Sequence, residues 1–231
     1  MKLRVPYLYL LVVALAIIGI AWAPTLIVAA PRENTMGLVQ KIFYFHVPIA
    51  WTTFQSAFIC AGGAIAFLFW KSEKGERLAV AAAELTVVFG LLVLVTGPLW
   101  ARKAWGRWWE WDVRLTSTLL LWMIFVAYLF ARRYGGAGGR RLAAGLAIFG
   151  AADVPLIYLS VSIWRTIHPK TTVVSSLDPG MRAAFWMSFA AMTLLYFVLL
   201  GARLALERTR ASLDELHLAA EDHGLLDGEQ A

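Results

Sequence analysis

The sequence contains little cysteine and little charge. Its one cysteine, Cys60, lies in an apolar stretch, which excludes an internal disulfide framework, a cysteine zinc site, an iron–sulfur cluster and a C-x-x-C-H haem attachment site. Charged residues make up 16% of the chain, against about a quarter in soluble domains. Hydrophobic residues make up 60% of its 231 residues. These proportions exclude an ordinary soluble enzyme and predict an all-α integral membrane protein.

Long gaps between charged residues predict six transmembrane helices, because a spanning helix needs roughly 20 apolar residues. The gaps cover residues 5–31, 42–70, 78–101, 115–131, 142–164 and 183–202. The fourth gap is short, so we expect that helix to borrow a turn from the residues before it. Glu84 and Asp153 are acids inside predicted spans, and such acids by default face the bundle interior. Residues 203–231 form a polar tail, in which we expect a helix end and a solvated segment.

Basic residues predict the orientation of the chain in the membrane. With six spans both termini share one side, and that side carries twelve of the 21 lysines and arginines: Lys2, Arg4, Lys71, Lys74, Arg77, Arg132, Arg133, Arg140, Arg141, Arg203, Arg208 and Arg210. We therefore expect cytoplasmic termini. The first apolar run exceeds the roughly 7 to 15 residues of a signal-peptide core, which predicts an uncleaved anchor. In this setting the net charge of +6 indicates topology and anionic head groups, with no nucleic-acid partner.

The connection between the third and fourth spans is rich in tryptophan. Five tryptophans fall within twelve residues: Trp100, Trp105, Trp108, Trp109 and Trp111. An aromatic belt would place one or two at each helix end, whereas these lie on one side of the membrane, among charges of both signs. If Trp108, Trp109 and Trp111 begin a surface helix, residues 105, 108, 109 and 112 share one face. That face suits a flat hydrophobic ligand with anionic edges, and a porphyrin fits this description.

The same connection keeps positive charge on the side where the topology rule disfavours it. Its four basic residues are Arg102, Lys103, Arg107 and Arg114. Arginine and lysine match the carboxylates of porphyrin propionates, and some of the four must also pair with Glu110 and Asp112. This retained charge predicts that the connection uses it for binding.

Two of the four histidines are candidate haem ligands. His46 lies at the external start of the second span, and His168 lies just beyond the external end of the fifth. A single histidine at a helix end is usually only an interfacial polar group, but these two flank the tryptophan cluster on its own side. Imidazole is a common axial ligand of haem iron. His217 and His223 lie in the polar tail and are interpreted as solvated.

Three stretches of the sequence resemble those of a known family. The stretch WGRWWEWDVRLTS (105–117) is similar to the tryptophan-rich "WWD" signature of haem-handling proteins in cytochrome c biogenesis. With FYFHVPIAW (43–51), PLIYLSVSIWRTIHP (155–169) and six spans, the resemblance narrows to the haem exporter protein C (CcmC) family over about residues 7–202. We call residues 105–112 the tryptophan loop.

The resemblance implies a binding site and a task. It implies that His46 and His168 are the axial ligands of a non-covalently bound haem b, and that the tryptophan loop, from Trp105 to Asp112, forms the haem platform. Residues 1–202 would then be a haem-handling transmembrane domain in a bacterial inner membrane. Haem would be bound at the periplasmic face and delivered to a periplasmic haem chaperone, CcmE. The partners implied within the membrane complex are CcmA, CcmB and CcmD.

The sequence does not indicate an enzyme. No Walker sequence is present, so any ATP hydrolysis belongs to a partner subunit. One alternative is a b-type electron-transfer subunit, although such haems normally lie deep between helices and no histidine lies mid-span here. A second alternative is a haem-conducting channel, although no string of polar residues crosses the six spans. We expect a haem receptor and transfer protein.

Overall fold

The fold is all-α, as the composition predicts. The structure is a computed structural model that describes residues 6–169 and 173–223. Along the chain lie α1 (Tyr7–Ala29), η1, a 3-10 helix (Leu38–Ile42), α2 (Phe43–Trp70), α3 (Glu73–Trp105), α4 (Val113–Tyr134), α5 (Gly136–Ile163) and α6 (Pro179–Asp222). The six α-helices are each long and apolar enough to cross a membrane. The chain is therefore a multi-pass membrane protein, and each predicted span overlaps one helix.

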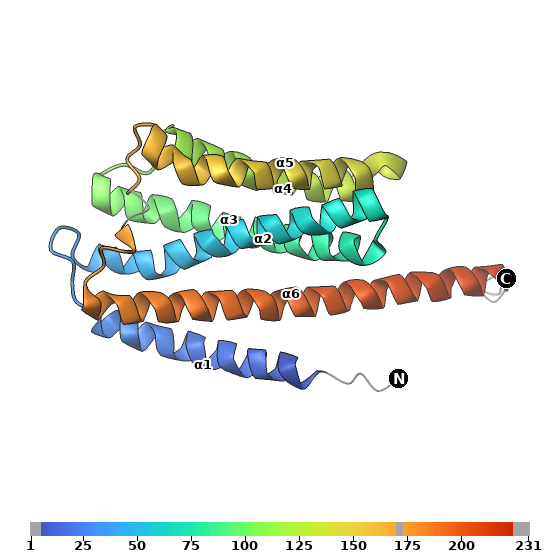
Figure 1. Cartoon of the computed structure of the whole chain (residues 1–231), viewed down its shortest axis with the longest axis horizontal. Coiled ribbons are helices and arrows are strands. Elements are labelled where there is room, and N and C mark those ends of the chain that lie inside the picture. Colours follow the sequence, from blue (N-terminus) through green and yellow to red (C-terminus); the bar gives the residue numbers. More distant parts are fainter. Residues whose placement is uncertain (1–5, 170–172, 224–231) are drawn as a thin grey trace, which may run out of the picture.

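The helices run side by side, so that their connections gather at two ends of the bundle (Figure 1). One end, which we call the site end, holds η1, the tryptophan loop and the connection from α5 to α6. The opposite end, which we call the termini end, holds the start of α1, the two short turns α2–α3 and α4–α5, and the end of α6. Helix α2 packs against α3, α5 and α6, while α1 packs against α6. Helix α2 therefore lies at the centre of the bundle.

Short polar signals begin and end the helices near the site. Helix α3 ends at Gly106, whose φ of 77° is a left-handed conformation that glycine adopts without strain. Helix α4 begins at Asp112, whose carboxylate accepts a hydrogen bond from the backbone N–H of Leu115. Helix α6 begins after Asp178, which caps Gly180 N–H, and has Pro179 in its first turn. These caps fix where α3 ends and where α4 and α6 begin at the site end.

Four helices, α3 to α6, are longer than the charge pattern predicts. Helix α3 continues to Trp105, and α4 covers Val113–Tyr134, so it gains residues at both ends. Helix α6 continues to Asp222 through the segment expected to be a helix end and a solvated tail. Ion pairs one turn apart, Arg203–Glu207 and Arg210–Glu207, support this extension. Figure 1 shows α6 reaching beyond the other helices at the termini end.

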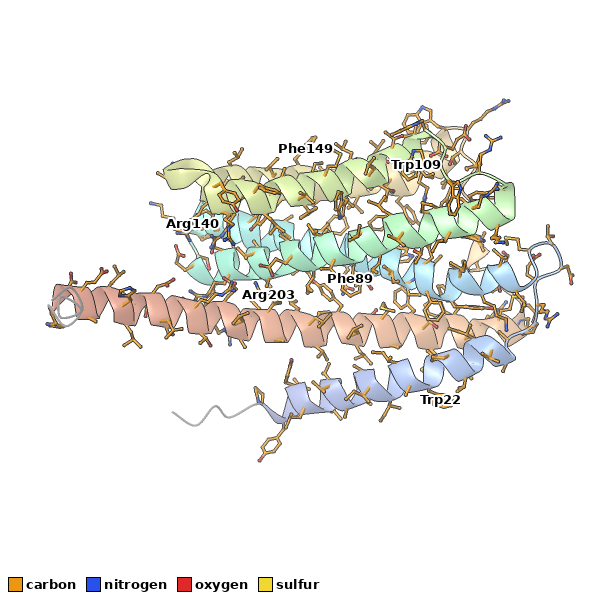
Figure 2. All side chains as sticks on the ribbon, turned by 180° about the vertical axis from the view of Figure 1, so that it is seen from behind. Trp22, Phe89, Trp109, Arg140, Phe149 and Arg203 are labelled. Atoms are coloured by element: carbon orange, nitrogen blue, oxygen red, sulfur yellow. The ribbon has the colours of Figure 1, made fainter. Side chains whose placement is uncertain are left out.

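The two acids inside the predicted spans have different environments. Glu84 of α3 accepts hydrogen bonds from Nε and Nη2 of Arg203 on α6, at 2.5 and 2.6 Å. It is thus part of an interhelical ion pair. Asp153 of α5 is buried, and its Oδ2 has no hydrogen-bond partner among the described residues. In Figure 2, Arg203 and Arg140 lie toward the termini end of the bundle, whereas Trp109 lies at the site end.

Candidate functional site

His46 is held in one tautomer by α3. It lies in the first turn of α2, it is buried, and its Nδ1 is 2.8 Å from Oγ1 of Thr96. The Thr96 hydroxyl donates its own proton to the carbonyl of Leu92 at 2.7 Å. The oxygen of Thr96 therefore accepts from His46 Nδ1–H, which leaves the lone pair of Nε2 free to bind a metal. Such a partner on the second ring nitrogen is typical of metal-ligating histidines.

His168 is held in the same tautomer by its own loop. Its Nδ1 is 2.9 Å from the carbonyl oxygen of Pro169, which can only accept, so Nδ1 carries the proton and Nε2 is free. Removal from water, together with the positive charge of Arg114, lowers the pKa of His168 to about 3. The ring is therefore neutral, and a neutral imidazole is the form that binds iron.

Asp112 joins the tryptophan loop to the loop of His168. One carboxylate oxygen caps α4 at the N–H of Leu115, at 2.8 Å. The other accepts from the hydroxyl of Thr166 and, at 3.3 Å, from the N–H of Ile167. The Thr166 oxygen in turn accepts from the backbone N–H of His168 at 3.1 Å. Asp112 thus acts on the position of His168, and it lines neither of the two cavities described next.

Two cavities meet at the histidine pair. The larger, of about 610 Å³, lies against α2, α5, α6 and the connection after His168. The smaller, of about 70 Å³, lies between α2, α3, α4 and the tryptophan loop. Six residues line both cavities: His46, Ala50, Phe54, Trp100, Arg114 and His168. The walls are mostly apolar and aromatic with a few polar groups, which is the composition of small-molecule sites.

The tryptophan loop divides into inward and outward rings. Trp105 and Trp109 line the smaller cavity. Trp108 and Trp111 are 56% and 75% exposed and line neither of the two cavities that contain the histidines. Residues 106–112 are not helical, so the surface helix that would place 105, 108, 109 and 112 on one face does not form. Glycine at 106 and the cap at Asp112 interrupt the helix, and the rings therefore point to different sides.

The basic residues of the connection divide in the same way. Arg114 lines both cavities. Arg107 pairs with Glu110 at 2.5 Å on the surface, and Arg102 donates to the carbonyl of Gly106. Lys103 is exposed. Of the four candidates for a ligand's carboxylates, Arg114 is thus the one that the structure places beside both histidines.

Trp100 belongs to the site, although in the sequence it counts only as one of the five clustered tryptophans and not as a candidate binding residue. It is buried at the end of α3, its ring centroid lies 6.2 Å from that of His46, and it lines both cavities. The indole N–H groups of Trp100 and Trp109 are buried without a hydrogen-bond partner among the described residues.

The donor set suits a metal that brings ligands of its own. Within residues 6–169 and 173–223, no group of three or more histidine, cysteine, aspartate or glutamate side chains could hold a bare ion. Two neutral imidazoles in an aromatic cavity instead fit an iron whose other four ligands come from a porphyrin. Fold and site together define a class: a multi-pass membrane protein with a histidine pair set in an aromatic cavity at one end of its bundle.

Comparison with known proteins identifies the family. The family model described as Heme exporter protein C matches residues 1–222. Heme exporter protein C of Escherichia coli K12 is 33% identical over 214 residues, covering 89% of this chain and 82% of that protein. The Bradyrhizobium diazoefficiens protein of that name is 33% identical over 195 residues, covering 82% of this chain and 74% of its own. The chain belongs to the heme exporter protein C family, whose task is haem export for cytochrome c maturation.

A mitochondrial relative extends the comparison. A Marchantia polymorpha protein described as a putative cytochrome c biosynthesis ccmC-like mitochondrial protein is 29% identical over 195 residues, covering 79% of this chain and 84% of its own. The resemblance expected from the tryptophan signature is thereby confirmed. The family's name describes a transport component rather than an enzyme.

Proposed function

We propose that this chain binds haem b between His46 and His168 at the periplasmic face of the bacterial inner membrane and delivers it to the periplasmic chaperone CcmE. The observation that carries the proposal is the histidine pair itself. Both rings line the same two cavities, and each uses Nδ1 in a hydrogen bond that leaves Nε2 free. The proposal adds the ligands, the acceptor and the sidedness to the family's general task.

The two cavities account for the flat shape of the cargo. A ring coordinated on both faces by two histidines extends sideways from the line that joins them. The larger cavity lies on the α6 side of that pair, and the smaller lies on the side of the tryptophan loop. A porphyrin between the imidazoles therefore has space on one side and the rings of Trp105 and Trp109 on the other.

The ligand set favours transfer over oxygen chemistry. Two imidazoles and four porphyrin nitrogens complete the coordination of the iron, so no position remains open for dioxygen. Release then needs one imidazole to leave the iron. We assign this role to His168, because it lies in the connection between α5 and α6, whereas His46 lies within α2 and is hydrogen-bonded to α3.

The outward rings of the tryptophan loop suit a partner. Trp108 and Trp111 are exposed large apolar side chains at the site end, and exposed aromatic rings are typical anchors of protein interfaces. We assign them to the contact with CcmE. The membrane and ATP-binding partners CcmA, CcmB and CcmD would complete the export complex, with ATP hydrolysis outside this chain.

Absorption spectroscopy tests the ligand assignment. The purified full chain, loaded with haem b, is expected to show a low-spin bis-histidine spectrum. His46→Ala and His168→Ala should each convert it to a high-spin spectrum or lose the haem, because one axial ligand is gone. His217→Ala is the matched control, since His217 lies on the exposed part of α6. If both cavity variants kept the low-spin spectrum of the parent, the axial assignment would be wrong.

A further inference from the structure

Helix α6 forms a wall of the site that nothing in the tryptophan signature predicts. Its first turns line the larger cavity with Arg182, Phe185, Trp186 and Phe189, opposite residues of α2 and α4. Phe185 and Trp186 are in edge-on contact, with ring centroids 5.1 Å apart. The wall is therefore aromatic except for one cation, Arg182.

Arg182 is held in place through Nε, and its other two guanidinium nitrogens have no hydrogen-bond partner among the described residues. Its Nε donates to the carbonyl of Leu177 at 3.0 Å, and its backbone N–H donates to the carbonyl of Asp178. The Asp178 carboxylate caps α6 through Gly180 N–H at 2.8 Å. Among the described residues no carboxylate lies within ion-pair distance of Arg182. The guanidinium thus lines the cavity with a fixed stem, and its terminal N–H groups have no partner in the part of the chain that the structure describes.

Arg114 is a second guanidinium that lines the same cavity. It comes from α4, and its Nη1 donates to the carbonyl of Ile157 at 3.3 Å. Among residues 6–169 and 173–223 no carboxylate lies within ion-pair distance of Arg114, although the charge of the nearby Asp112 acts on it. Other cations at the site end are engaged elsewhere: Lys41 donates to the carbonyls of Ile27 and Val28, and Arg107 pairs with Glu110. Two guanidiniums that form no ion pair with any described residue thus line the cavity beside the histidines, and they match a cargo with two carboxylates.

We propose that Arg182 binds one of the two propionate carboxylates of the haem, so that α6 fixes the orientation of the ring in the cavity. This inference rests on the proposed function. Arginine suits the role because its planar fork donates two parallel hydrogen bonds to a carboxylate. With the propionate edge held toward α6, the opposite, vinyl-bearing edge lies toward Trp105 and Trp109, on the side of the tryptophan loop.

The test removes either the guanidinium of Arg182, by mutation, or the carboxylates of the haem, by esterification. Full-length wild-type protein and Arg182→Ala are titrated with haem b and with haem b dimethyl ester, which has the same ring and iron but no carboxylates. We expect Arg182→Ala to weaken haem b binding about tenfold, as for loss of a charged hydrogen bond, with an unchanged low-spin spectrum. It should bind the dimethyl ester as tightly as the wild type does.

Two further variants separate a charge effect from a general one. Arg165→Ala removes an exposed arginine at the same end that lines neither cavity with the histidines, and it should bind both ligands normally. Arg182→Lys keeps the charge without the fork and should lose about threefold for haem b alone. Equal losses of haem b and ester in Arg182→Lys and Arg182→Ala, or no loss in either, would overturn the assignment. Failure of the wild type to give a low-spin spectrum would instead refute the proposed function.

Discussion

The hydroxyl of Thr96 decides which nitrogen of His46 is available. Its proton is used on the carbonyl of Leu92, so its oxygen must accept from Nδ1 of the imidazole. Thr96 lines neither of the two cavities that contain the histidines, but it positions a residue that lines both. A neighbouring glycine completes the fit, because a Cβ at Gly97 would lie 3.3 Å from Cε1 of His46, closer than ordinary contact. The ring is therefore positioned by α3 as much as by its own helix.

Replacing Thr96 by valine tests this second layer. Thr96→Val keeps the shape of the side chain but removes the acceptor, so the tautomer and orientation of His46 are no longer fixed. We expect haem affinity to fall about tenfold, within the range for partners of metal ligands. Spectral titration measures it. Thr25→Val, which removes an exposed hydroxyl bonded only to the carbonyl of Trp22, should bind haem like the parent; equal affinity for both variants would refute a role for Thr96.

The tryptophans make a second test at the residue scale. Replacing Trp105 and Trp109 together by alanine should weaken haem retention, since each lost ring contact costs on the order of 1 kcal/mol beyond area burial. Replacing Trp108 and Trp111 together should leave retention unchanged but slow haem transfer to CcmE, because these rings point outward. Haem retention after gel filtration and transfer in a mixed assay are the two measurements. Similar defects in both pairs would mean that the loop acts as one surface.

At the scale of elements, the spans were predictable and the shape of the loop was not. Charge-free runs mark the six helices because each must be long and apolar enough to cross a bilayer. The tryptophan loop has no such constraint. Its form depends on Gly106 ending α3 and on Asp112 bonding to Thr166, a partner 54 residues later. Local periodicity cannot report a contact of that kind, so the expected surface helix was wrong.

Part of the site could not be predicted because its residues lie far apart in the sequence. His46 and His168 are conspicuous because histidine is rare in this chain, and Arg114 stands within the tryptophan signature. Trp186 and Arg182 carry no such mark: in sequence they are an ordinary aromatic residue and an ordinary cation at the start of a span. Only the packing of α6 against α2 brings them to the cavity. Helix α6 also continues past the expected boundary, because its polar residues pair along the helix rather than ending it.

Asp112 links two elements, which gives an element-scale prediction. Asp112→Ala removes the cap of α4, at a cost of about 1 kcal/mol, and frees the loop of His168. We expect a mixed high-spin and low-spin haem spectrum, because His168 is no longer held. Ser72→Ala removes the equivalent cap of α3 at the termini end and serves as the control. It should lower stability by a similar amount without changing the spectrum; a spectral change in both variants would reduce the role of Asp112 to capping.

At the scale of the whole molecule, delivery to a periplasmic chaperone depends on which side of the membrane the site end faces. The histidines, the tryptophan loop and Arg182 all lie at the site end, whereas the ion pairs of Glu76 and Glu84 lie in the other part of the bundle. Basic residues favour a cytoplasmic termini end by twelve of 21. That margin is small because the site end keeps its own cations. If those cations bind the cargo, binding explains why they are retained on the side where the topology rule disfavours basic residues.

Cysteine labelling tests the orientation directly. With Cys60 replaced by alanine, single cysteines are placed at Arg107, on the surface of the site end, and at Ala137, which is exposed at the termini end. A membrane-impermeant thiol reagent applied to intact cells should label Arg107→Cys and spare Ala137→Cys. Permeabilised cells should show labelling of both, which controls for reactivity. The opposite pattern in intact cells would place the cavity in the cytoplasm and rule out delivery to a periplasmic chaperone.

The hydrogen bond between Asp112 and Thr166 can form only after both partners have been synthesised. The carboxylate emerges from the ribosome 54 residues ahead of the hydroxyl that it binds. A nascent chain that has inserted only α1 to α4 therefore contains His46 and the tryptophan loop, but neither the second histidine nor the α6 wall. Such a chain has half a site. If haem is held between His46 and His168, as proposed, tight capture would have to wait until translation is nearly complete, and unfinished or truncated chains would not sequester this reactive cargo.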